Sequence, residues 1–211
     1  MSPISQYYET MAASIIKGLE KRGMEGYYFP SSKEAVASIL SMIPSGSSVS
    51  WGGSVTLSES GMMDALKSAD LELIDRSSAK SPQEKKSLER SAFGADYYFM
   101  STNAITTDGE LVNVDGNGNR TAALIYGPDH VMILAGMNKV AADAEAAVRR
   151  IHTQAAPPNA IRLGLHTSCS QTGICRDCLS PDCICAHTVI TRFNRIPGRI
   201  KVFLIGETLG F

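Results

Sequence analysis

The stretch "SSVSWGGSVTLSESGMMDALKSADLELID", residues 47–75, decides the fold class of this chain. Its beginning favours a strand over 48–51, which a pair of glycines follows. The sequence "TLSE" at 56–59 fits a capping box, so we expect a helix over 57–68. "LELID", residues 71–75, is typical of a second strand. A strand, a helix and another strand in this order predict two parallel strands joined by a helical crossover.

The chain on either side of this stretch repeats the pattern. Apolar residues at helical spacing predict a helix over 4–22, and "GYYFP" at 26–30 predicts a strand. The sequence "SSKE" at 31–34 can cap a further helix. "SPQE" starts another helix that we expect over 81–93, with proline in its first turn. The expected fold is therefore α/β, with a Rossmann-like, mostly parallel sheet and helices on both faces.

After residue 95 the pattern changes to short apolar runs separated by strong turn signals. These runs predict a β-meander that is added to the sheet or completes it. Its strands are expected over 96–105, 110–114, 121–127 and 130–136.

Fewer elements are expected in the C-terminal part. Asn138 can cap an alanine-rich helix over 139–151. Two consecutive prolines, 157–158, indicate the end of the core, and a last buried strand is expected within 198–210. The whole chain, 1–211, is predicted to form a single domain.

The composition excludes several classes of function. The chain has 211 residues, of which 44% are hydrophobic and 19% charged, values that are typical of soluble globular proteins. A net charge of −1 provides no basic surface for phosphates, so nucleic acid is not an expected partner. The N-terminal residues lack the apolar core of a signal peptide, and no apolar run is long enough to span a bilayer. We therefore expect a cytoplasmic protein without a membrane partner.

Residues 52–56, "GGSVT", form a glycine loop between a predicted strand and a predicted helix. Such a junction offers free backbone N–H groups and the positive end of a helix dipole, which favour phosphate or carboxylate. Open α/β sheets also bind ligands at this edge. A tight turn that merely contains glycines fits the residues equally well, and Trp51 is expected in the core or in a pocket wall. The candidate ligand-binding residues of this loop are Gly52, Gly53, Ser54 and Thr56.

Polar residues gather in the polar segment, "TNAITTDGELVNVDGNGNR", residues 102–120. Turns favour Asn, Asp and Gly, so most of these residues need no function. We single out Asn103, Asp115, Asn119 and Arg120. The carboxylate of Asp115 and the guanidinium of Arg120 could serve an anionic substrate, or they could form an ion pair that contributes little. Asp115 is the candidate general acid or base.

All the cysteines fall in the cysteine segment, residues 166–187, which is predicted to be a metal-binding loop inserted before the last strand. They are Cys169, Cys175, Cys178, Cys183 and Cys185, with the spacing C-x5-C-x2-C-x4-C-x1-C. In a reducing compartment, clustered thiols are more often ligands or redox groups than disulfides. The C-x2-C pair can place two thiolates on one metal.

Three alternatives fit the cysteine segment: a 4Fe-4S cluster, a structural zinc ion, and free or redox-active thiols. Zinc ribbons normally use two C-x2-C pairs and this chain has one, which favours iron-sulfur. Dithiol redox chemistry requires fewer thiols than the segment contains. His166 and His187 border the segment, but with enough cysteines available neither is needed as a ligand.

Taken together, three parts of the chain resemble the lactate-utilisation (LUD) domain family. They are "WGGSVTLSESG" at 51–61, "NAITTDGELVNVDGNGNRTAALIYGPDHVMILAGMNKV" at 103–140, and "TSCSQTGICRDCLSPDCICAHTVI" at 167–190 with the terminal "VFLIGETLGF". The resemblance implies an α/β fold similar to that of the NagB, ribose-phosphate isomerase and CoA-transferase superfamily. It also implies a link to lactate oxidation, in which family members with extra iron-sulfur domains act in complexes. This chain lacks a ferredoxin-like C-x2-C-x2-C repeat, so we do not expect it to be such a multi-cluster component.

The resemblance also assigns residues. The family's glycine loop falls on Gly52, Gly53 and Ser54, and its polar loop on Asn103, Asp115, Gly116, Asn119 and Arg120. The cysteine pattern of the small single-domain members falls on Cys169, Cys175, Cys178 and Cys185. Cys183 stands where these members are expected to have arginine, and is therefore the candidate spare thiol.

The leading functional hypothesis is a redox-linked accessory protein or enzyme that binds a small anionic organic ligand and a 4Fe-4S cluster, with a redox protein as a possible partner. One alternative is a non-catalytic module in which zinc stabilises the loop and a partner docks. A further alternative, from analogy of fold alone, is a sugar-phosphate isomerase or a CoA-transferase-like enzyme. The oligomeric state is open, and a homo-oligomer is compatible with the sequence.

Overall fold

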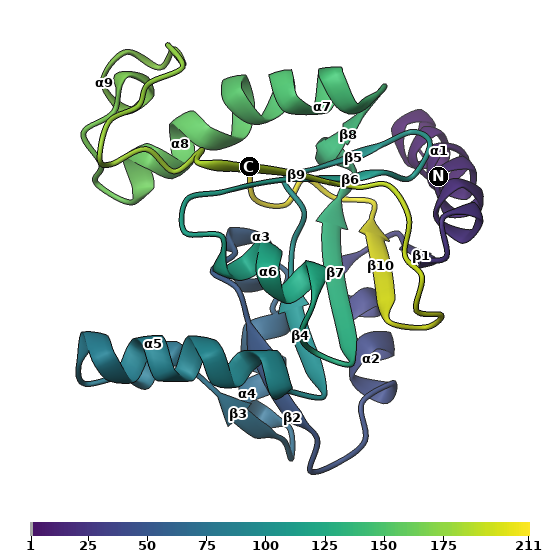
Figure 1. Ribbon diagram of the computed structural model, residues 1–211. Helices are drawn as coiled ribbons and strands as arrows, with labels where there is room; N and C mark the ends of the chain where they lie inside the picture. The colour runs from purple at the N-terminus through teal and green to yellow at the C-terminus, as the bar shows by residue number, and fades with distance from the viewer. Residues whose placement is uncertain (1) are drawn as a thin grey trace.

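The computed structural model describes residues 2–211 and has a sheet of six parallel strands at its centre (Figure 1). The strand order is β1-β10-β7-β4-β2-β3, and every neighbouring pair is parallel. This arrangement confirms the predicted α/β fold. The strands are β1 (Glu25–Phe29), β2 (Ser48–Trp51), β3 (Glu72–Ile74), β4 (Tyr97–Met100), β7 (His130–Gly136) and β10 (Ile200–Ile205).

The central strands are apolar on both faces because both faces are covered. In β7, Val131 and Ile133 pack into one core cluster while Met132 and Leu134 pack into another. Strand β10 divides its residues between the same two clusters. This is why the two strands read as continuous apolar runs rather than as an alternation.

Helices cover the two faces of this sheet. On one face lie α1 (Pro3–Lys21) and α6 (Asn119–Ile125). On the other lie α2 (Ser32–Ser41), α3 (Val55–Glu59) and α4 (Met62–Ser68). Helix α5 (Pro82–Ser91) extends away from the sheet (Figure 1). Two predicted caps are confirmed, because the Ser31 and Ser81 side chains accept the N–H groups of residues 34 and 84.

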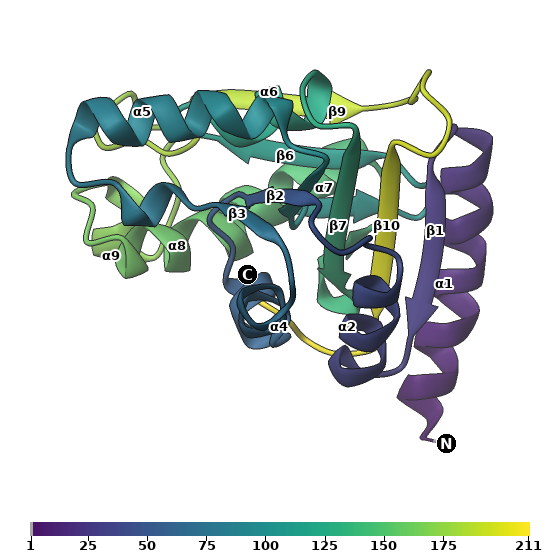
Figure 2. The ribbon, with the colours of Figure 1, turned by 90° about the horizontal axis from the view of Figure 1, so that it is seen from below.

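A second, four-stranded sheet has the order β8-β5-β6-β9, and its strands run across those of the first (Figure 2). It consists of β5 (Ala104–Thr106), β6 (Leu111–Asp115), β8 (Val140–Ala141) and β9 (His187–Thr191). Its outer face packs against α7 (Ala144–Arg150) and the following π-helical turn (Ile151–Ala155), which leads into α8 (Ala156–Arg162). Helix α9 (Ser168–Thr172) lies inside the cysteine segment, and β9 begins at its last residue.

The predicted single meander is wrong. The run 96–105 divides into β4 and β5, which belong to different sheets. Residues 121–127 lie mostly in helix α6 instead of a strand, and β7 is a central parallel strand. Helix α6 starts after Gly118, whose φ of +76° is a left-handed conformation that turns the chain. The Asp115 carboxylate then accepts N–H groups of the first turn, which satisfies donors that a helix start leaves free.

The predicted helix over 57–68 is also divided in two. Gly61 has a φ of +78° and separates α3 from α4. The cap of α3 is Ser54, whose hydroxyl accepts the Leu57 N–H, and not Thr56. Thr56 is buried and its hydroxyl donates to the Leu209 carbonyl instead. The serine two residues earlier therefore takes the capping role, because the side chain of Thr56 is held by the core.

The predicted helix over 139–151 begins later, at α7, where Asp143 is the cap. Asn138 and Lys139 lie before it, in a 3-10 turn at Met137–Lys139. The two prolines at 157–158 do not end the core but lie in the first turn of α8, directly after the π-helical turn. No helix within residues 2–211 is long and apolar enough to cross a bilayer.

Candidate functional site

Three loops meet at the carboxyl edge of the central sheet. The glycine loop follows β2, residues 101–103 follow β4, and the turn Met137–Lys139 follows β7. These three strands are neighbours in the order β7-β4-β2. Parallel strands bring their following loops to one edge, which is where open α/β sheets bind ligands. The loops line a cavity of about 800 Å³.

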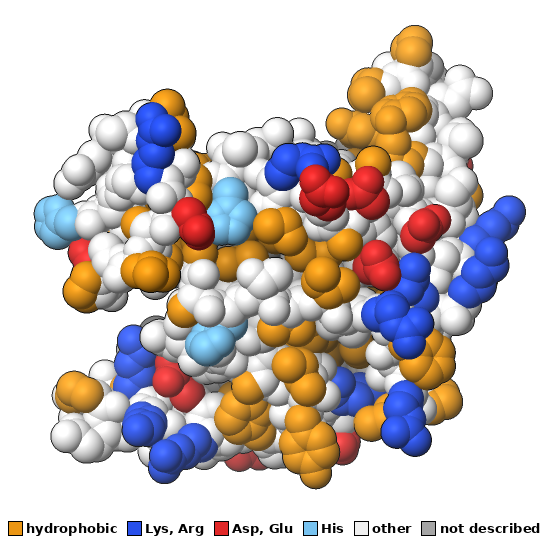
Figure 3. Space-filling model, turned by 45° about the horizontal axis from the view of Figure 1, so that its top comes forward, with side chains coloured by type: hydrophobic (Ala, Val, Ile, Leu, Met, Phe, Trp, Pro, Cys, Tyr) orange, Lys and Arg blue, Asp and Glu red, His pale blue; other side chains and the backbone are white. Residues whose placement is uncertain are grey.

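The remaining walls of this cavity come from more distant parts of the chain. Glu89 of α5, Asn159 of α8 and Phe211 line it, together with residues 181–185 of the cysteine segment. Figure 3 shows the molecule deeply hollowed on one side, between two projecting lobes. The glycine loop, the polar segment and the cysteine segment therefore share one cavity, although they are far apart in the sequence.

Lys139 is the principal site residue that the sequence analysis missed. It is 4% exposed, and its Nζ lies 2.8 Å from Thr56 Oγ1 and 2.9 Å from Ser101 Oγ. Burial lowers the pKa of this amine to about 7, and the nearby Arg150 and Arg120 add to the effect. The sequence signal was a lysine three residues after the buried run "HVMILAG". This lysine was instead assigned to the start of a helix over 139–151.

Lys139→Met should raise the free energy of unfolding at pH 6 by about 1–3 kcal/mol, because burying an ammonium costs more than its two hydrogen bonds return. The folded pKa of about 7 lies below the usual lysine value of about 10.4. Between these values the unfolded chain binds the extra proton, so wild-type stability rises with pH across this window. Below pH 7 Lys139 is protonated in both the folded and the unfolded state, so the free-energy cost of burying the ammonium is fully present. The stabilisation by methionine should therefore shrink from pH 6 to pH 9.

Urea unfolding at both pH values measures this difference. Lys85→Met is the matched control, because Lys85 lines the same cavity but is exposed. This control should change stability little at either pH. A Lys139→Met protein that is less stable than the wild type at both values would show that the amine is retained for structure.

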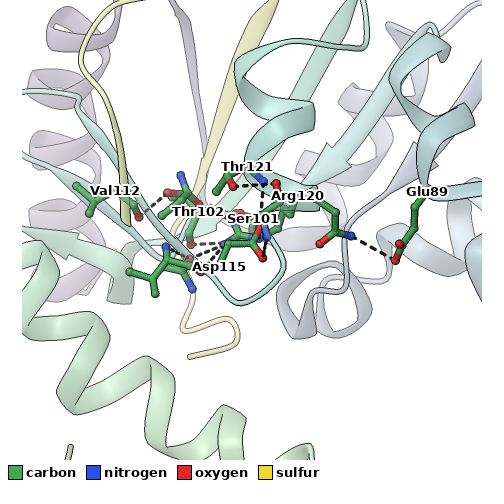
Figure 4. A network of polar contacts seen from close by, with 12 residues as sticks. Glu89, Ser101, Thr102, Val112, Asp115, Arg120 and Thr121 are labelled. Atoms are coloured by element: carbon green, nitrogen blue, oxygen red, sulfur yellow. Dashed lines mark hydrogen bonds and ion pairs between the residues drawn. The ribbon is translucent and has the colours of Figure 1, made fainter. Parts of the chain in front are cut away.

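The Arg120 side chain, which lines the cavity, makes a dense network of hydrogen bonds (Figure 4). Its Nη1 donates to the Ser101 carbonyl at 3.1 Å and to Asn113 Oδ1 at 2.6 Å. Its Nη2 donates to Asn103 Oδ1 at 2.7 Å and to the Val114 carbonyl at 2.9 Å. The four N–H groups of the two terminal nitrogens thus each have a protein acceptor. Arg120 joins the loop that follows β4 to strand β6, and this geometry favours a supporting role over direct contact with a ligand.

Asp115 is similarly engaged with the backbone. Its Oδ1 accepts the Gly118 N–H and its Oδ2 accepts the Thr121 N–H, each at 3.1 Å. Its Oδ2 also lies 3.9 Å from Arg120 Nε. Asp115 borders the cavity, as predicted, but these contacts suit a helix cap better than a general base. Its role as acid or base stays a prediction.

The glycine loop combines a packing role with free backbone donors. A Cβ at Gly52 would lie 3.1 Å from Arg120 Cδ and from the Tyr98 hydroxyl, so a side chain there would displace the arginine. The Gly52 N–H donates to the Phe99 carbonyl. Within residues 2–211, the N–H groups of Gly53 and Ser54 have no hydrogen-bond acceptor, and both residues line the cavity. The helix that follows has only five residues, so these N–H groups matter more than its dipole.

Basic side chains outnumber acidic ones around the cavity. Arg76 pairs with Glu89 at 3.3 Å, and Glu89 also accepts from Asn119 Nδ2 at 3.4 Å. These contacts and the Arg120–Asp115 pair give Glu89 and Asp115 basic partners, so Asp182 is the acidic lining residue that remains. The charged groups left over are Lys85, Lys139, Arg162 and Asp182. The surplus of positive charge favours an anionic ligand.

The cysteine segment gathers its thiols beside this cavity. Cys183 and Cys185 are in the cavity wall, while Cys169 is buried with its Sγ 3.2 Å from Thr167 Oγ1. His166 and His187 are exposed. A different histidine, His152 of the π-helical turn, lies with Nδ1 3.3 Å from the Cys175 thiol. It was missed because the fold, and not the sequence, brings it there.

The thiols also influence one another's ionisation. Burial, and then the negative charge that the other four thiols would carry, raises the pKa of Cys185 to about 12. Burial acts against ionisation of Cys178 too, but hydrogen bonds from Ser180, Cys183 and Ser168 lower its pKa. Within residues 2–211, no three His, Cys, Asp or Glu side chains are placed around a single point as ligands of one metal ion. Metal binding by this segment therefore stays a prediction.

A family model described as the LUD domain matches residues 12–205. Among solved structures, a DUF162 family protein from Deinococcus radiodurans is similar over 94% of this chain and 98% of its own, with a TM-score of 0.54 and 11% identity. Ribose 5 phosphate isomerase A from Neisseria gonorrhoeae aligns over 54% of each chain, with a TM-score of 0.34 and 12% identity. The alignment with eIF2B delta from Chaetomium thermophilum covers 68% of this chain and 55% of that protein, with a TM-score of 0.34 and 18% identity. Curated proteins give no match.

Proposed function

Because the chain belongs to the LUD domain family, we propose that it is a redox-linked protein that binds a small organic anion next to a 4Fe-4S cluster. One observation carries the proposal: the cavity at the carboxyl edge of the sheet is lined both by the glycine loop and by Cys183 and Cys185. A ligand in this cavity would lie beside the group that the cysteines hold.

The cavity supports the anionic part of the proposal. Its free N–H groups at Gly53 and Ser54 are suitable donors to carboxylate or phosphate oxygens. Unpaired positive charge at Lys85 and Arg162 adds electrostatic attraction. An organic acid or a phosphate ester would satisfy both features.

The cysteine segment fits a metal cluster by its donor chemistry. A cation between the thiols would turn the repulsion that raises the pKa of Cys185 into attraction, because metals bind the thiolate form. A cluster spreads its thiolates over several irons, so it does not need the convergence on one point that a single ion requires. Cys169, Cys175, Cys178 and Cys185 would hold the cluster, and it would supply one-electron redox chemistry. Such a protein would exchange electrons with a redox protein partner.

Protein purified without oxygen should contain about four irons and about four sulfides per chain, with broad visible absorption near ~400 nm. Metal and sulfide analysis with a visible spectrum measures this. Small organic acids added to the same sample should change the spectrum, because the cavity adjoins the cysteines. Chloride at equal ionic strength is the control and should have no effect.

About one zinc per chain with no colour would contradict the cluster and would indicate a structural zinc site. In that case the non-catalytic alternative, a ligand-binding or docking module, would replace the redox function. A coloured protein whose spectrum ignores every organic acid would retain the cluster but contradict the proposed ligand site.

A further inference from the structure

The surroundings of Lys139 are unusual for a buried lysine. Within residues 2–211 its Nζ has no ion pair, and both of its hydrogen-bond partners are neutral hydroxyls. The charged groups that act on it are the cations Arg150 and Arg120 and one acid, Glu59, whose effect is the smallest. Arg150 donates to the carbonyls of Asn138 and Asn103, so it is held in place beside the amine. A buried lysine without a carboxylate is expensive, which indicates a role other than packing.

The two hydroxyls fix how the amine is hydrogen-bonded. Thr56 Oγ1 donates its proton to the Leu209 carbonyl at 3.2 Å, and Ser101 Oγ donates to the Thr102 carbonyl at 3.3 Å. Both hydroxyl oxygens must therefore accept N–H groups from Lys139. The protein thus provides two acceptors, which is the number that a neutral amine can use. The third position on Nζ, a lone pair in the neutral form, has no protein partner.

We propose that Lys139 is a nucleophilic amine that captures the carbonyl carbon of a small aldehyde or keto acid as an imine. This deepens the proposed function and rests on its ligand site, since Lys139 lines the same cavity as Gly53 and Ser54. The substrate class follows from two features of the cavity: the unpartnered amine, which suits a carbonyl group, and the surplus of positive charge, which suits a carboxylate or phosphate. A pKa of about 7 leaves a large fraction of the amine neutral at physiological pH.

The chemistry balances without an additional reagent. The lone pair of Nζ adds to the carbonyl carbon, the carbonyl oxygen takes a proton, and a carbinolamine forms. Loss of the hydroxyl group as water, with the remaining proton leaving nitrogen, gives the C=N bond. The two protons of the neutral amine thus leave in the water that is released. Thr56 and Ser101 orient the amine for this addition, because their oxygens accept its N–H groups.

Reductive trapping tests the proposal. The full-length protein, with whatever metal it carries, is incubated at pH 7 with glyoxylate and cyanoborohydride, and modified lysines are mapped by peptide mass spectrometry. We expect one carboxymethyl group on Lys139, formed at least about 100-fold faster than at Lys85, because ordinary lysines are about 0.1% neutral or less at this pH. Lys85 is the internal control, since it lines the same cavity but is exposed. The rate at Lys139 should rise with pH through an inflection near 7.

Variants separate this role from a structural one. Lys139→Met should abolish the adduct, while Lys86→Arg, at an exposed lysine outside the cavity, should leave it unchanged. Two results with the wild-type protein would overturn the proposal: labelling of Lys139 that is no faster than labelling of Lys85, or a labelling rate at Lys139 that rises only near pH 10. Both are measured without any variant.

A second readout keeps this test separate from the proposed function. Glycolate has the same carboxylate as glyoxylate but no carbonyl group. If glycolate changes the spectrum but glyoxylate gives no adduct on Lys139, the imine is overturned and the anion site stays intact. The absence of both would overturn the imine together with the ligand site.

Discussion

Arg120→Ala should lower the free energy of unfolding by about 3–5 kcal/mol, the range seen when one partner is removed from a buried charged network. The substitution removes four hydrogen bonds, to the Asn103 and Asn113 amide oxygens and to two backbone carbonyls. Of these acceptors, Asn103 Oδ1 keeps the Val114 N–H as a donor. It also removes the aliphatic stem that packs on Gly52. Urea denaturation, followed by circular dichroism, measures the change as a shift in the midpoint.

Two variants serve as controls for this result. Arg76→Ala removes a partly exposed ion pair with Glu89 and should cost less than about 1 kcal/mol. Arg120→Lys should recover only part of the loss, because an ammonium cannot reach four acceptors in a planar arrangement. A stable Arg120→Ala protein that no longer responds to organic acids would contradict the supporting role and favour direct ligand contact, as the sequence analysis proposed.

Replacing Cys169, Cys175, Cys178 or Cys185 singly by serine should remove most of the bound iron, whereas Cys183→Ser should retain it. Each of the four is a proposed ligand, and serine is a poor substitute for thiolate on a cluster. Cys183 is in the cavity wall and receives the Cys185 N–H at 3.4 Å, a contact that does not require a metal. Iron and sulfide per chain in protein purified without oxygen measure the difference.

Alkylation gives an independent check on this assignment. In the iron-loaded wild-type protein, iodoacetamide should modify Cys183 and spare the four ligands, which react only after the metal is removed. Loss of iron in Cys183→Ser, with iron retained in one of the other four variants, would transfer the ligand role to Cys183.

Local signals in the sequence were sufficient for part of the central sheet, but not for β4 and β7, whose residues were assigned to a meander. The strand Ser48–Trp51 has the predicted bounds, and the serine caps at 31 and 81 start helices where expected. These features depend on neighbours a few residues away, so their physics is contained in short stretches. Prediction failed at 121–127, where an apolar run without clear periodicity forms a helix and not a strand. Such runs cannot be assigned until their packing partners are known.

The sequence by itself determined the α/β class, the family and the residue types available at the site. Only the tertiary structure decided what those residues do. It placed Lys139 between Thr56 and Ser101, brought His152 to Cys175, and directed Arg120 to acceptors inside the protein. The physical reason is that the pKa and the hydrogen-bond partners of a side chain depend on burial and on groups distant in the sequence. Parallel strands bring those groups together at one edge of the sheet, and no local sequence pattern indicates which of them become neighbours.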